Sequence, residues 1–435
     1  MGHINKNLNL PSSGKRLRIA FFDYPDVFED FYTNYDVSQA DFATWHNTAN
    51  HTWLEIIQNN IGDVTWYITC IKPELRETVH KKVGCKLKFL SSSWLHRLLW
   101  KAFYLPSFAW RWKRFYRSYA VLASYLAPFS FSLILSLYKE KPDVIFVQDY
   151  CSGRFDTLLF ISWILKIPLL TFHSGSISDK YLGKNLKKYT IPKARWIFSS
   201  GSNESLNLIN NFTVNQSLIN IIRPPIDTAI YRIIEKEDAC LKLDLNSAKR
   251  YLLFVGRFED GVKRISSIIT VFQNLASKYP DVDLLIVGGG EDEQDLKNQS
   301  ENMIPGRVIF AGWISEDEKK ALFYNVSDCL ILASWREASP AVIGEAFSCG
   351  IPVVSSDVGG IDDLVVQEKS GWLFTPGDDE ALLRHLDYVL ANPEKIKAMR
   401  SHVRKIAEET VSIPVISKAL QEGFAAVLEN EKQSF

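Results

Sequence analysis

The stretch DCLILASWREASPAVIGEAFSCGIPVVSS (328–356) joins two short apolar runs through a polar loop and a helix-like segment. Ser339 is predicted as the N-cap of this helix and Pro340 as its first residue, where the missing N–H costs nothing. Gly350 is of the type favoured just past a helix end, so the helix is expected to stop there. A strand, a helix and a second strand in this order favour two parallel strands covered by the helix.

The same alternation continues along most of the 435-residue chain. A chain of this length exceeds the size at which a single hydrophobic core stops growing, so two domains are expected. Paired prolines followed by a mixed-charge segment place the boundary near 228–245, which gives domains over 1–228 and 229–411. Both are predicted to be doubly wound, Rossmann-like α/β domains. Further strands are expected at 17–23, 64–70, 143–148, 167–172, 195–200, 219–224, 251–257, 282–290 and 307–312.

The composition, with 46% hydrophobic and 23% charged residues, is typical of a globular protein. Fifty basic residues balance fifty acidic ones, so nucleic acid is not expected as a partner. Six dispersed cysteines lack the spacing of a metal site; no metal is expected, and a reduced compartment is favoured. The polar N-terminus lacks the apolar run of a signal peptide, which favours the cytoplasm. No phosphate-binding loop is found, and no G-x-G-x-x-G follows the first strand.

Two glutamates, Glu337 and Glu345, bracket the start of the predicted helix. Glu345 is expected about 8 Å along the helix axis from Pro340, so one ligand of the size of a nucleotide sugar could touch both glutamates. Carboxylates suit ribose or sugar hydroxyls, while the helix N-terminus suits a phosphate. The alternative is a pair of solvated glutamates on a surface helix.

Two cations lie at the end of the apolar run YLLFVGR (251–257) and just beyond it: Arg257 is its last residue, and Lys263 follows six residues later. Parallel strands place such residues at the carboxyl edge of the sheet, where open α/β sheets bind ligands. Fixed positive charge there could stabilise a departing diphosphate. Alone, such a pair is more often a solvated loop, but its position relative to the glutamates favours the binding interpretation.

Four motifs then occur in a fixed order: GRF…K (256–263), IVGGGED (286–292), VIFAGW (308–313) and SWREASPAVIGEAFSCGIPVVSSDVGGIDDLV (334–365). Together they resemble the C-terminal half of retaining glycosyltransferases of family 4, in which seven residues separate two glutamates. The resemblance is strong over about residues 250–376. It implies a GT-B fold, with two Rossmann-like domains facing a central cleft and a last helix, 412–435, that crosses back to the first domain.

The resemblance also implies site residues. Arg257 and Lys263 would contact the diphosphate of the donor, Glu337 the transferred sugar and Glu345 the ribose. Further donor contacts are implied for Gly256, Gly312, Ala338, Ser339 and Ala341. Two positions depart from the pattern of the family: Arg264 stands where glycine is usual, and GGIDD (359–363) replaces Gly-Gly-hydrophobic-Pro-Glu.

In the first domain, His173 follows the strand-like run 167–172 and resembles a family histidine that faces the donor sugar. Its expected role is a hydrogen bond to the sugar or the transition state, against the alternative of a structural histidine. Asp23, His46 and His51 are candidate acceptor contacts, although a structural or solvent-facing role is the alternative for each.

The segment 94–120 carries six basic residues, no acid, and aromatic residues at helical spacing. It could lie on an anionic membrane surface and admit a lipid-linked acceptor. The alternative is an aromatic stripe packed in the core. The following stretch, 121–138, is long enough to span a membrane, but Pro128 and several serines favour a buried helix instead.

The sequence therefore predicts a retaining glycosyltransferase. It would move a sugar from a UDP- or GDP-sugar to a hydroxyl of a sugar, lipid-linked or small-molecule acceptor, without a metal or another cofactor. A phosphorylase or synthase of the same fold that uses a sugar phosphate is one alternative. A non-catalytic protein that binds sugar nucleotides is the other.

Overall fold

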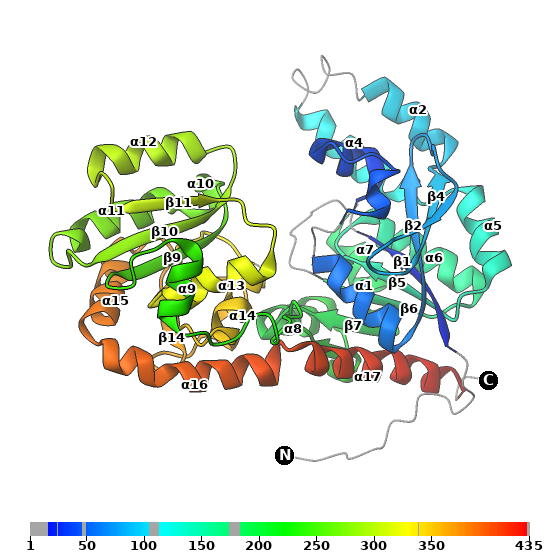
Figure 1. The fold of residues 1–435 in the computed structure, drawn as a ribbon. Coiled ribbons are helices and arrows are strands. Elements are labelled where there is room, and N and C mark those ends of the chain that lie inside the picture. The colour runs from blue at the N-terminus through cyan, green and yellow to red at the C-terminus, as the bar shows by residue number, and fades with distance from the viewer. Residues whose placement is uncertain are drawn as a thin grey trace. The chain divides into compact units, whose positions relative to one another are not determined.

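The computed structural model describes residues 16–23, 25–45, 49–103, 113–173, 183–337 and 339–432. It divides into two compact units, each built on its own sheet (Figure 1). The first unit contains the chain up to Ile222 together with the segment from Ser417 on, and the second contains Arg223–Ile416. The predicted fold class is confirmed, because both units are α/β and both sheets are parallel apart from one edge strand.

The first unit has an eight-stranded sheet of order β3-β4-β2-β1-β5-β6-β7-β8. Neighbouring strands are parallel except β3, which runs antiparallel to β4. The most central pairs join β1 to β2 and to β5, so the first strand of the chain lies inside the sheet. The strands are β1 (Leu17–Phe22), β2 (Gly62–Cys70), β3 (Glu77–Val79), β4 (Lys86–Ser91), β5 (Val144–Gln148), β6 (Leu169–Phe172), β7 (Trp196–Ser199) and β8 (Ile219–Ile221).

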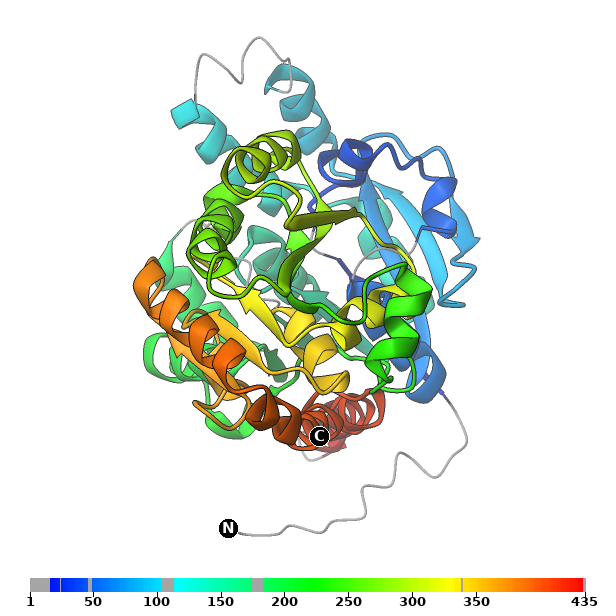
Figure 2. The same cartoon turned by 60° about the vertical axis from the view of Figure 1, so that its left-hand side comes forward.

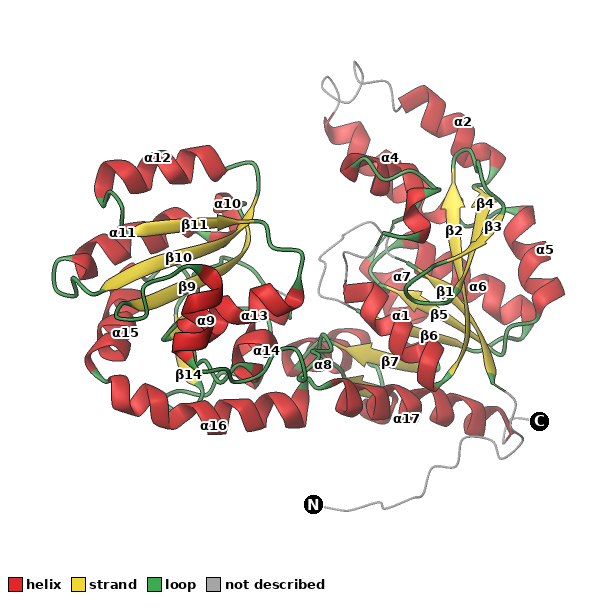
Figure 3. Ribbon diagram, in the orientation of Figure 1, coloured by secondary structure: helices red, strands yellow, loops and turns green. Residues whose placement is uncertain are grey.

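Helices cover this sheet, and the last helix of the chain is one of them (Figure 3). Phe424 of α17 packs its ring 5.7 Å from that of Phe146 and 6.5 Å from that of Phe198. The helices are α1 (Ala49–Asn60), α2 (Trp94–Phe103), α4 (Lys113–Leu126), α5 (Phe131–Glu140), α6 (Gly153–Leu165), α7 (Lys184–Thr190), α8 (Ser202–Phe212) and α17 (Ile413–Lys432), with short 3-10 helices at Phe28–Asp30, Tyr32–Tyr35, Asp41–Ala43, Ile191–Lys193 and Gln216–Leu218.

One stretch of the described chain, Ala120–Glu140, is long and apolar enough to cross a membrane by length and composition. It forms two helices rather than one: α4 ends at Leu126, and α5 begins after Ser130, whose side chain caps it by accepting a hydrogen bond from the amide of Leu133. The expectation of one buried helix was therefore wrong. Pro128 lies between the two helices, as expected for a residue that cannot continue a helix.

The second unit has a six-stranded, fully parallel sheet of order β11-β10-β9-β12-β13-β14. Its strands are β9 (Arg250–Arg257), β10 (Val282–Gly289), β11 (Val308–Gly312), β12 (Cys329–Leu332), β13 (Val353–Ser356) and β14 (Gly371–Phe374). Its helices are α9 (Lys236–Leu243), α10 (Asp260–Lys263), α11 (Ile265–Ala276), α12 (Glu293–Met303), α13 (Asp317–Val326), α14 (Ala341–Ser348), α15 (Asp379–Ala391) and α16 (Pro393–Thr410), with a 3-10 helix at Ile361–Asp363.

Successive residues of β9 pack on opposite faces of this sheet. Leu252 and Phe254 join one core with α11 and α15, whereas Leu253 and Val255 join a second core with α13 and α14. Helices accordingly lie on both sides of the strands (Figure 2). A sheet buried on both faces needs strands that are apolar throughout, which is why these strands read as continuous apolar runs.

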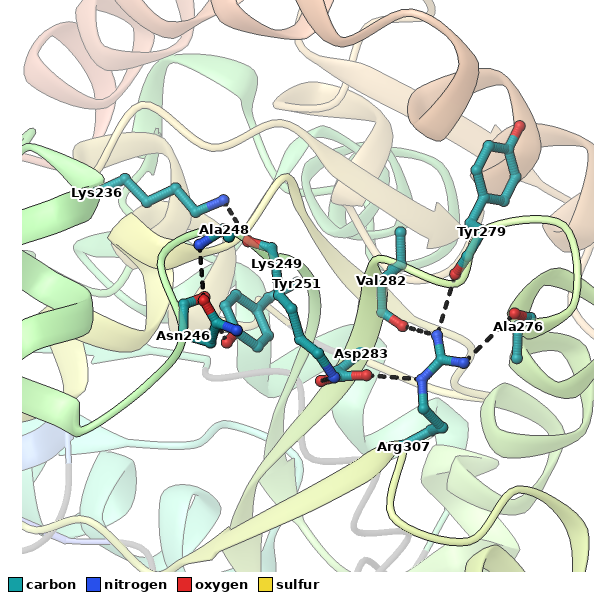
Figure 4. Close-up of polar contacts among 10 residues, drawn as sticks. All are labelled: Lys236, Asn246, Ala248, Lys249, Tyr251, Ala276, Tyr279, Val282, Asp283 and Arg307. Carbon is teal, nitrogen blue, oxygen red and sulfur yellow. Dashed lines mark hydrogen bonds and ion pairs between the residues drawn. The ribbon is translucent and has the colours of Figure 1, made fainter.

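A polar network holds the amino-terminal edge of the same sheet (Figure 4). Asp283 is only 2% exposed, and its carboxylate pairs with Lys249 and, at 2.7 Å, with Arg307. The Arg307 guanidinium also donates to the backbone carbonyls of Tyr279 and Val282. A buried carboxylate paired in this way is strongly destabilised when its partners are lost. The ion pairs and hydrogen bonds of Asp283 and Arg307 therefore stabilise the amino-terminal edge of this sheet.

Candidate active site

The central contact at the carboxyl edge of the second sheet joins Lys263 to Glu337. Lys263 follows β9 and Glu337 follows β12, and these strands are neighbours that run parallel. The Lys263 Nζ lies 2.6 Å from Glu337 Oε1, and the Ser334 Oγ donates to the same oxygen at 2.7 Å. The side chains of Lys263 and Glu337 are 22% and 9% exposed, so the pair is largely shielded from solvent. Charge-assisted bonds of this kind are the stronger class, and they fix both groups in place.

The turn that carries Lys263 depends on Arg264. Arg264 has φ 55° and ψ 43°, in the left-handed region that favours glycine. Its guanidinium pairs with Asp379 at 2.8 Å and lies 4.7 Å from the ring centre of Trp335. The amide of Trp335 donates to the carbonyl of Val262 at 2.8 Å. The arginine thus occupies a glycine conformation because contacts on its side chain hold it there.

The glycine run at the end of β10, Gly288 to Gly290, allows the backbones to approach one another closely. A Cβ on Gly288 would lie 1.8 Å from the carbonyl oxygen of Gly256, so no side chain fits there. Just beyond, Asp292 accepts a hydrogen bond from the amide of Asp260 at 2.6 Å. Asp260 begins α10, so the GGGED motif sets the position of the helix that ends in Lys263.

Arg257, the last residue of β9, is exposed. No carboxylate among the described residues is within ion-pairing distance of its guanidinium. Its positive charge is not neutralised by those residues, in contrast to that of Lys263. An anion at this edge would meet one cation that is already oriented by Glu337 and another that is free to move.

The helix after the loop begins later than the sequence predicted. Pro340 is the N-cap, with ψ 116°, and α14 runs from Ala341 to Ser348 without a side-chain cap. The assignment of Ser339 as N-cap was therefore wrong, because the extended conformation of Pro340 delays the first turn. The amides of Ala341 and Val342, at the first two helical positions, have no acceptor within the helix, whereas the amide of Ile343 donates to the carbonyl of Pro340 at 3.2 Å. Ala338 lies outside the described residues.

Glu345 lies inside α14 and is 7% exposed. Its carboxylate accepts from Lys320 at 3.1 Å and from the Tyr324 hydroxyl at 2.6 Å. Burial lowers the pKa of Lys320, but the charges of Glu345 and Asp317 outweigh that effect and hold the pKa above its usual value. Burial, together with the charge of Glu345, raises the pKa of Tyr324 well above its usual value. Glu345 is thus a fixed acceptor whose position depends on two residues of α13.

Gly312 ends β11 with φ 73° and has open space around its Cα. Trp313 follows it and is 61% exposed. A large aromatic side chain beside a turn at the carboxyl edge offers a surface for a planar ring.

In the first unit, His173 is held by Asp149. The two residues follow β6 and β5, which are neighbouring parallel strands. His173 Nδ1 lies 3.2 Å from Asp149 Oδ1, and the ring of Tyr150 lies 4.7 Å from the imidazole. Burial raises the pKa of the Asp149 carboxyl, but the hydrogen bond and charge of His173 outweigh it and leave the pKa below its usual value. This contact assigns a proton to Nδ1 and leaves Nε2 as the second hydrogen-bonding atom.

Asp149, Cys151 and His173 are also the one group of potential metal ligands found among the described residues, with their ligand atoms all within 4.8 Å of one another. His173 Nδ1 is already directed at Asp149, and Cys151 Sγ is 4.0 Å from the same nitrogen. The hydrogen bond to Asp149 therefore favours a role for His173 as an oriented hydrogen-bonding group over a role as a metal ligand.

Residues 236–406 match the family of group 1 glycosyltransferases. The match covers 171 of the 435 residues and lies entirely within the second unit. The chain is 27% identical to an uncharacterized glycosyltransferase of Haemophilus influenzae over 61% of this chain and 72% of the relative. It is 25% identical to the N-acetyl-alpha-D-glucosaminyl L-malate synthase of Bacillus anthracis over 59% of this chain and 72% of that protein.

Solved structures resemble the chain over nearly its whole length. Anabaena HepE in complex with UDP superposes with a TM-score of 0.68 at 16% identity, covering 94% of this chain and 100% of that one. Sucrose-phosphate synthase from Thermosynechococcus elongatus gives a TM-score of 0.69 at 19% identity, covering 95% and 100%. At these identities the likeness establishes the GT-B fold.

The remaining candidate residues lie in different settings. Asp23 is 8% exposed, accepts a hydrogen bond from Tyr32 and lines a small pocket together with Tyr32 and Arg154. His51 is fully buried, with its ring 4.9 Å from that of His80 in an aromatic core, so it is not placed to meet an acceptor. His46 lies outside the described residues.

The basic and aromatic segment 94–120 is described only in part. Its first helix, α2, includes Arg97 and Lys101. The residues that gave the segment its helical spacing lie where the chain or its side chains are not described: Phe108, Arg111, Trp112, Lys113, Arg114, Phe115, Tyr116, Arg117 and Tyr119.

Sequence reasoning missed the residues that orient the predicted ones. Asp149 has φ 73°, unusual for a residue other than glycine, but nothing in its sequence context indicates this. Lys320 and Tyr324 come from a different helix than Glu345. Their spacing of four residues places them on one face of α13, which is the only signal that the sequence contains.

Proposed function

We propose that this glycosyltransferase moves a sugar from a UDP- or GDP-sugar to an acceptor hydroxyl, with retention at the anomeric carbon and without a metal ion. The contact between Lys263 and Glu337, 2.6 Å long and next to the free cation Arg257, carries the proposal. It joins a group suited to phosphate with a group suited to sugar hydroxyls. Anabaena HepE, a structural neighbour, has been solved with UDP and with UDP-glucose, which supports a nucleotide-sugar donor.

Lys263 and Arg257 are assigned to the diphosphate. An ammonium group has three N–H donors, and Glu337 accepts from one of them, so the others can reach phosphate oxygens. As the bond between the anomeric carbon and the diphosphate breaks, negative charge develops on the leaving oxygen. A cation held in place beforehand stabilises this charge without reorganisation.

Glu337 is assigned to hydroxyls of the transferred sugar and Glu345 to the ribose. Each carboxylate accepts at least one hydrogen bond from the protein and retains acceptor capacity for a ligand hydroxyl. The opening amides of α14, with Ser339 and Gly312, are assigned to the phosphate and the base. His173 is assigned a hydrogen bond through Nε2 to a sugar hydroxyl.

The reaction that fits these groups takes place on one face of the sugar. The acceptor oxygen forms its bond to the anomeric carbon on the side from which the diphosphate departs, and a phosphate oxygen takes the hydroxyl proton. This route needs no separate protein base and retains the configuration. No carboxylate of the described chain is required to act as a nucleophile.

A panel of UDP- and GDP-sugars with mixed hydroxyl acceptors, scored by the release of nucleoside diphosphate, tests the proposal. Release with one donor, unchanged by EDTA, together with an anomeric coupling in the product that matches that of the donor supports it. Consumption of inorganic phosphate without nucleotide release would identify a phosphorylase instead. An inverted product would rule out the one-face route.

A further inference from the structure

Three helices of the first unit expose large apolar side chains to solvent. Trp94 on α2, Phe131 on α5 and Trp163 on α6 are 71%, 80% and 75% exposed. Scattered single exposures of this kind are normal, but a cluster of aromatic residues signals an interaction surface. The apolar face, as named here, consists of Trp94, Leu98, Phe131, Leu135, Tyr138, Phe160, Trp163 and Ile164, all at least 37% exposed.

The three helices place the side chains of the apolar face near one another. The inner sides of α5 and α6 share one core, through Leu137 and Leu158 among others, so both helices cover the same face of the sheet and their outer sides point away from it. Phe160 and Trp163 lie with ring centres 6.3 Å apart. The Ser132 hydroxyl donates to the carbonyl of Ser91 at 3.4 Å, which places the start of α5 against the strand end that leads into α2.

The acidic residues on the helices of the apolar face are paired within the protein, which leaves positive charge unpaired in the described part of the chain. α2 contains no acidic residue. Glu140 at the end of α5 is engaged by Lys88 and by the Tyr67 hydroxyl. Asp156 of α6 is 8% exposed and pairs with Lys187 at 3.0 Å.

Four exposed lysines remain on or directly after these helices, and none has an ion pair among the residues that the structure describes: Lys101, Lys139, Lys141 and Lys166. The charge available to a partner is therefore positive.

We propose that the apolar face docks on an anionic lipid bilayer, lying in the interface rather than spanning it. Trp and Tyr favour the headgroup region, and neighbouring lysines strengthen binding to anionic lipid. A second copy of the chain is a poorer occupant, because a two-fold contact would bring the same lysines together. The division of Ala120–Glu140 into two helices also argues against a span. The proposal does not depend on the reaction that the enzyme catalyses.

Flotation of the full-length protein with phosphatidylcholine vesicles, with and without phosphatidylglycerol, tests this proposal. We expect binding to the anionic vesicles at low salt, at least about tenfold stronger than to neutral ones, and reduced at high salt. The variant W94S/F131S/W163S should bind at least about tenfold more weakly. Leu241→Ser, at an 82% exposed position in the second unit, is the matched control and should bind as the wild type does.

Circular dichroism and thermal melting of each variant establish that the fold is intact. A folded triple variant that floats like the wild type would overturn the proposal, as would absence of binding at low salt. A concentration-dependent dimer that the triple substitution abolishes, without vesicle binding by the wild type, would assign the face to a second copy instead. Lys139→Glu combined with Lys166→Glu should weaken binding to anionic vesicles only. An equal loss of binding to neutral vesicles would contradict the proposed electrostatic contribution of the lysines.

Discussion

Single and double replacement of Lys263 and Glu337 tests whether the two residues act as a unit. Lys263→Ala removes a cation that we assign to the leaving diphosphate, and removal of one such preorganised group typically lowers kcat by about 10²-fold. Glu337→Gln preserves the shape and can still accept from Ser334, but it removes the charge that holds the ammonium group 2.6 Å away. A loss of at least tenfold in kcat is expected for this variant as well.

The strength of the pair sets the expected coupling. Exposed ion pairs contribute about 0.2–1 kcal/mol, whereas breaking a buried pair costs about 3–5 kcal/mol. With side chains 22% and 9% exposed, this pair lies between those limits. A coupling of about 1–2 kcal/mol follows. The double variant should therefore retain about 5–30 times more activity than the product of the two single effects predicts.

Nucleoside diphosphate release at saturating donor and acceptor gives kcat for the wild type, both single variants and the double variant. Lys263→Arg is the control, since it keeps the charge and should retain more activity than Lys263→Ala. Circular dichroism checks that each variant is folded. A folded Lys263→Ala variant with wild-type kcat would refute the phosphate assignment, and strictly multiplicative losses would refute the idea of one unit.

Three further predictions concern groups outside this pair. Asp149→Asn keeps a residue that tolerates positive φ, but it removes the negative charge beside His173. The kcat should fall at least about tenfold while the melting temperature stays unchanged. An unchanged kcat would contradict the role of Asp149 in orienting His173. Asp283→Ala should lower the free energy of unfolding, measured in urea, by about 3 kcal/mol. Asp281→Ala, at a half-exposed ion pair, should lower it by under about 1 kcal/mol. Equal losses for the two variants would contradict the stabilising role of the buried Asp283 network. Burial lowers the pKa of His96 to about 4, so between about pH 6.5 and 4 the unfolded chain binds a proton that the folded chain does not. The free energy of unfolding should therefore fall by about 3 kcal/mol as the pH falls across that range. His96→Leu should reduce this decline in urea titrations at several pH values, and an undiminished decline would contradict the argument.

Apart from the edge strands β8 and β11, which are only partly buried, the apolar runs that predicted strands correspond to strands largely buried on both faces, where no alternation is needed. The edge of the first sheet behaves differently. Lys86 and Lys88 of β4 alternate with apolar residues and pair with Glu77 of β3, so the stretch reads as a polar loop unless its partner strand is known. The two strands were missed because the ion pairs that stabilise them join residues whose pairing only the folded chain reveals.

The candidate site shows the same limit at the level of single residues. Parallel strands end at one edge, which is enough to predict that Lys263 and Glu337 lie at that edge. It is not enough to predict that they touch, because the 2.6 Å contact depends on the local turn. The partners of Glu345 come from another helix, and the partner of His173 comes from another strand, so neither follows from spacing along the chain.

Arg264 shows why a departure from a family pattern can leave the site intact. Glycine at this position would reach φ 55° freely, whereas an ordinary side chain in that region costs about 1–2 kcal/mol. Arg264 is buried, but its partners Asp379 and Trp335 are close to half exposed, so the ion pair and the stacking each contribute at most about 1 kcal/mol. Their sum is similar to the backbone cost. The arginine can thus replace glycine without loss of stability, and in exchange it ties the Lys263 turn to α15 and to the loop that carries Glu337.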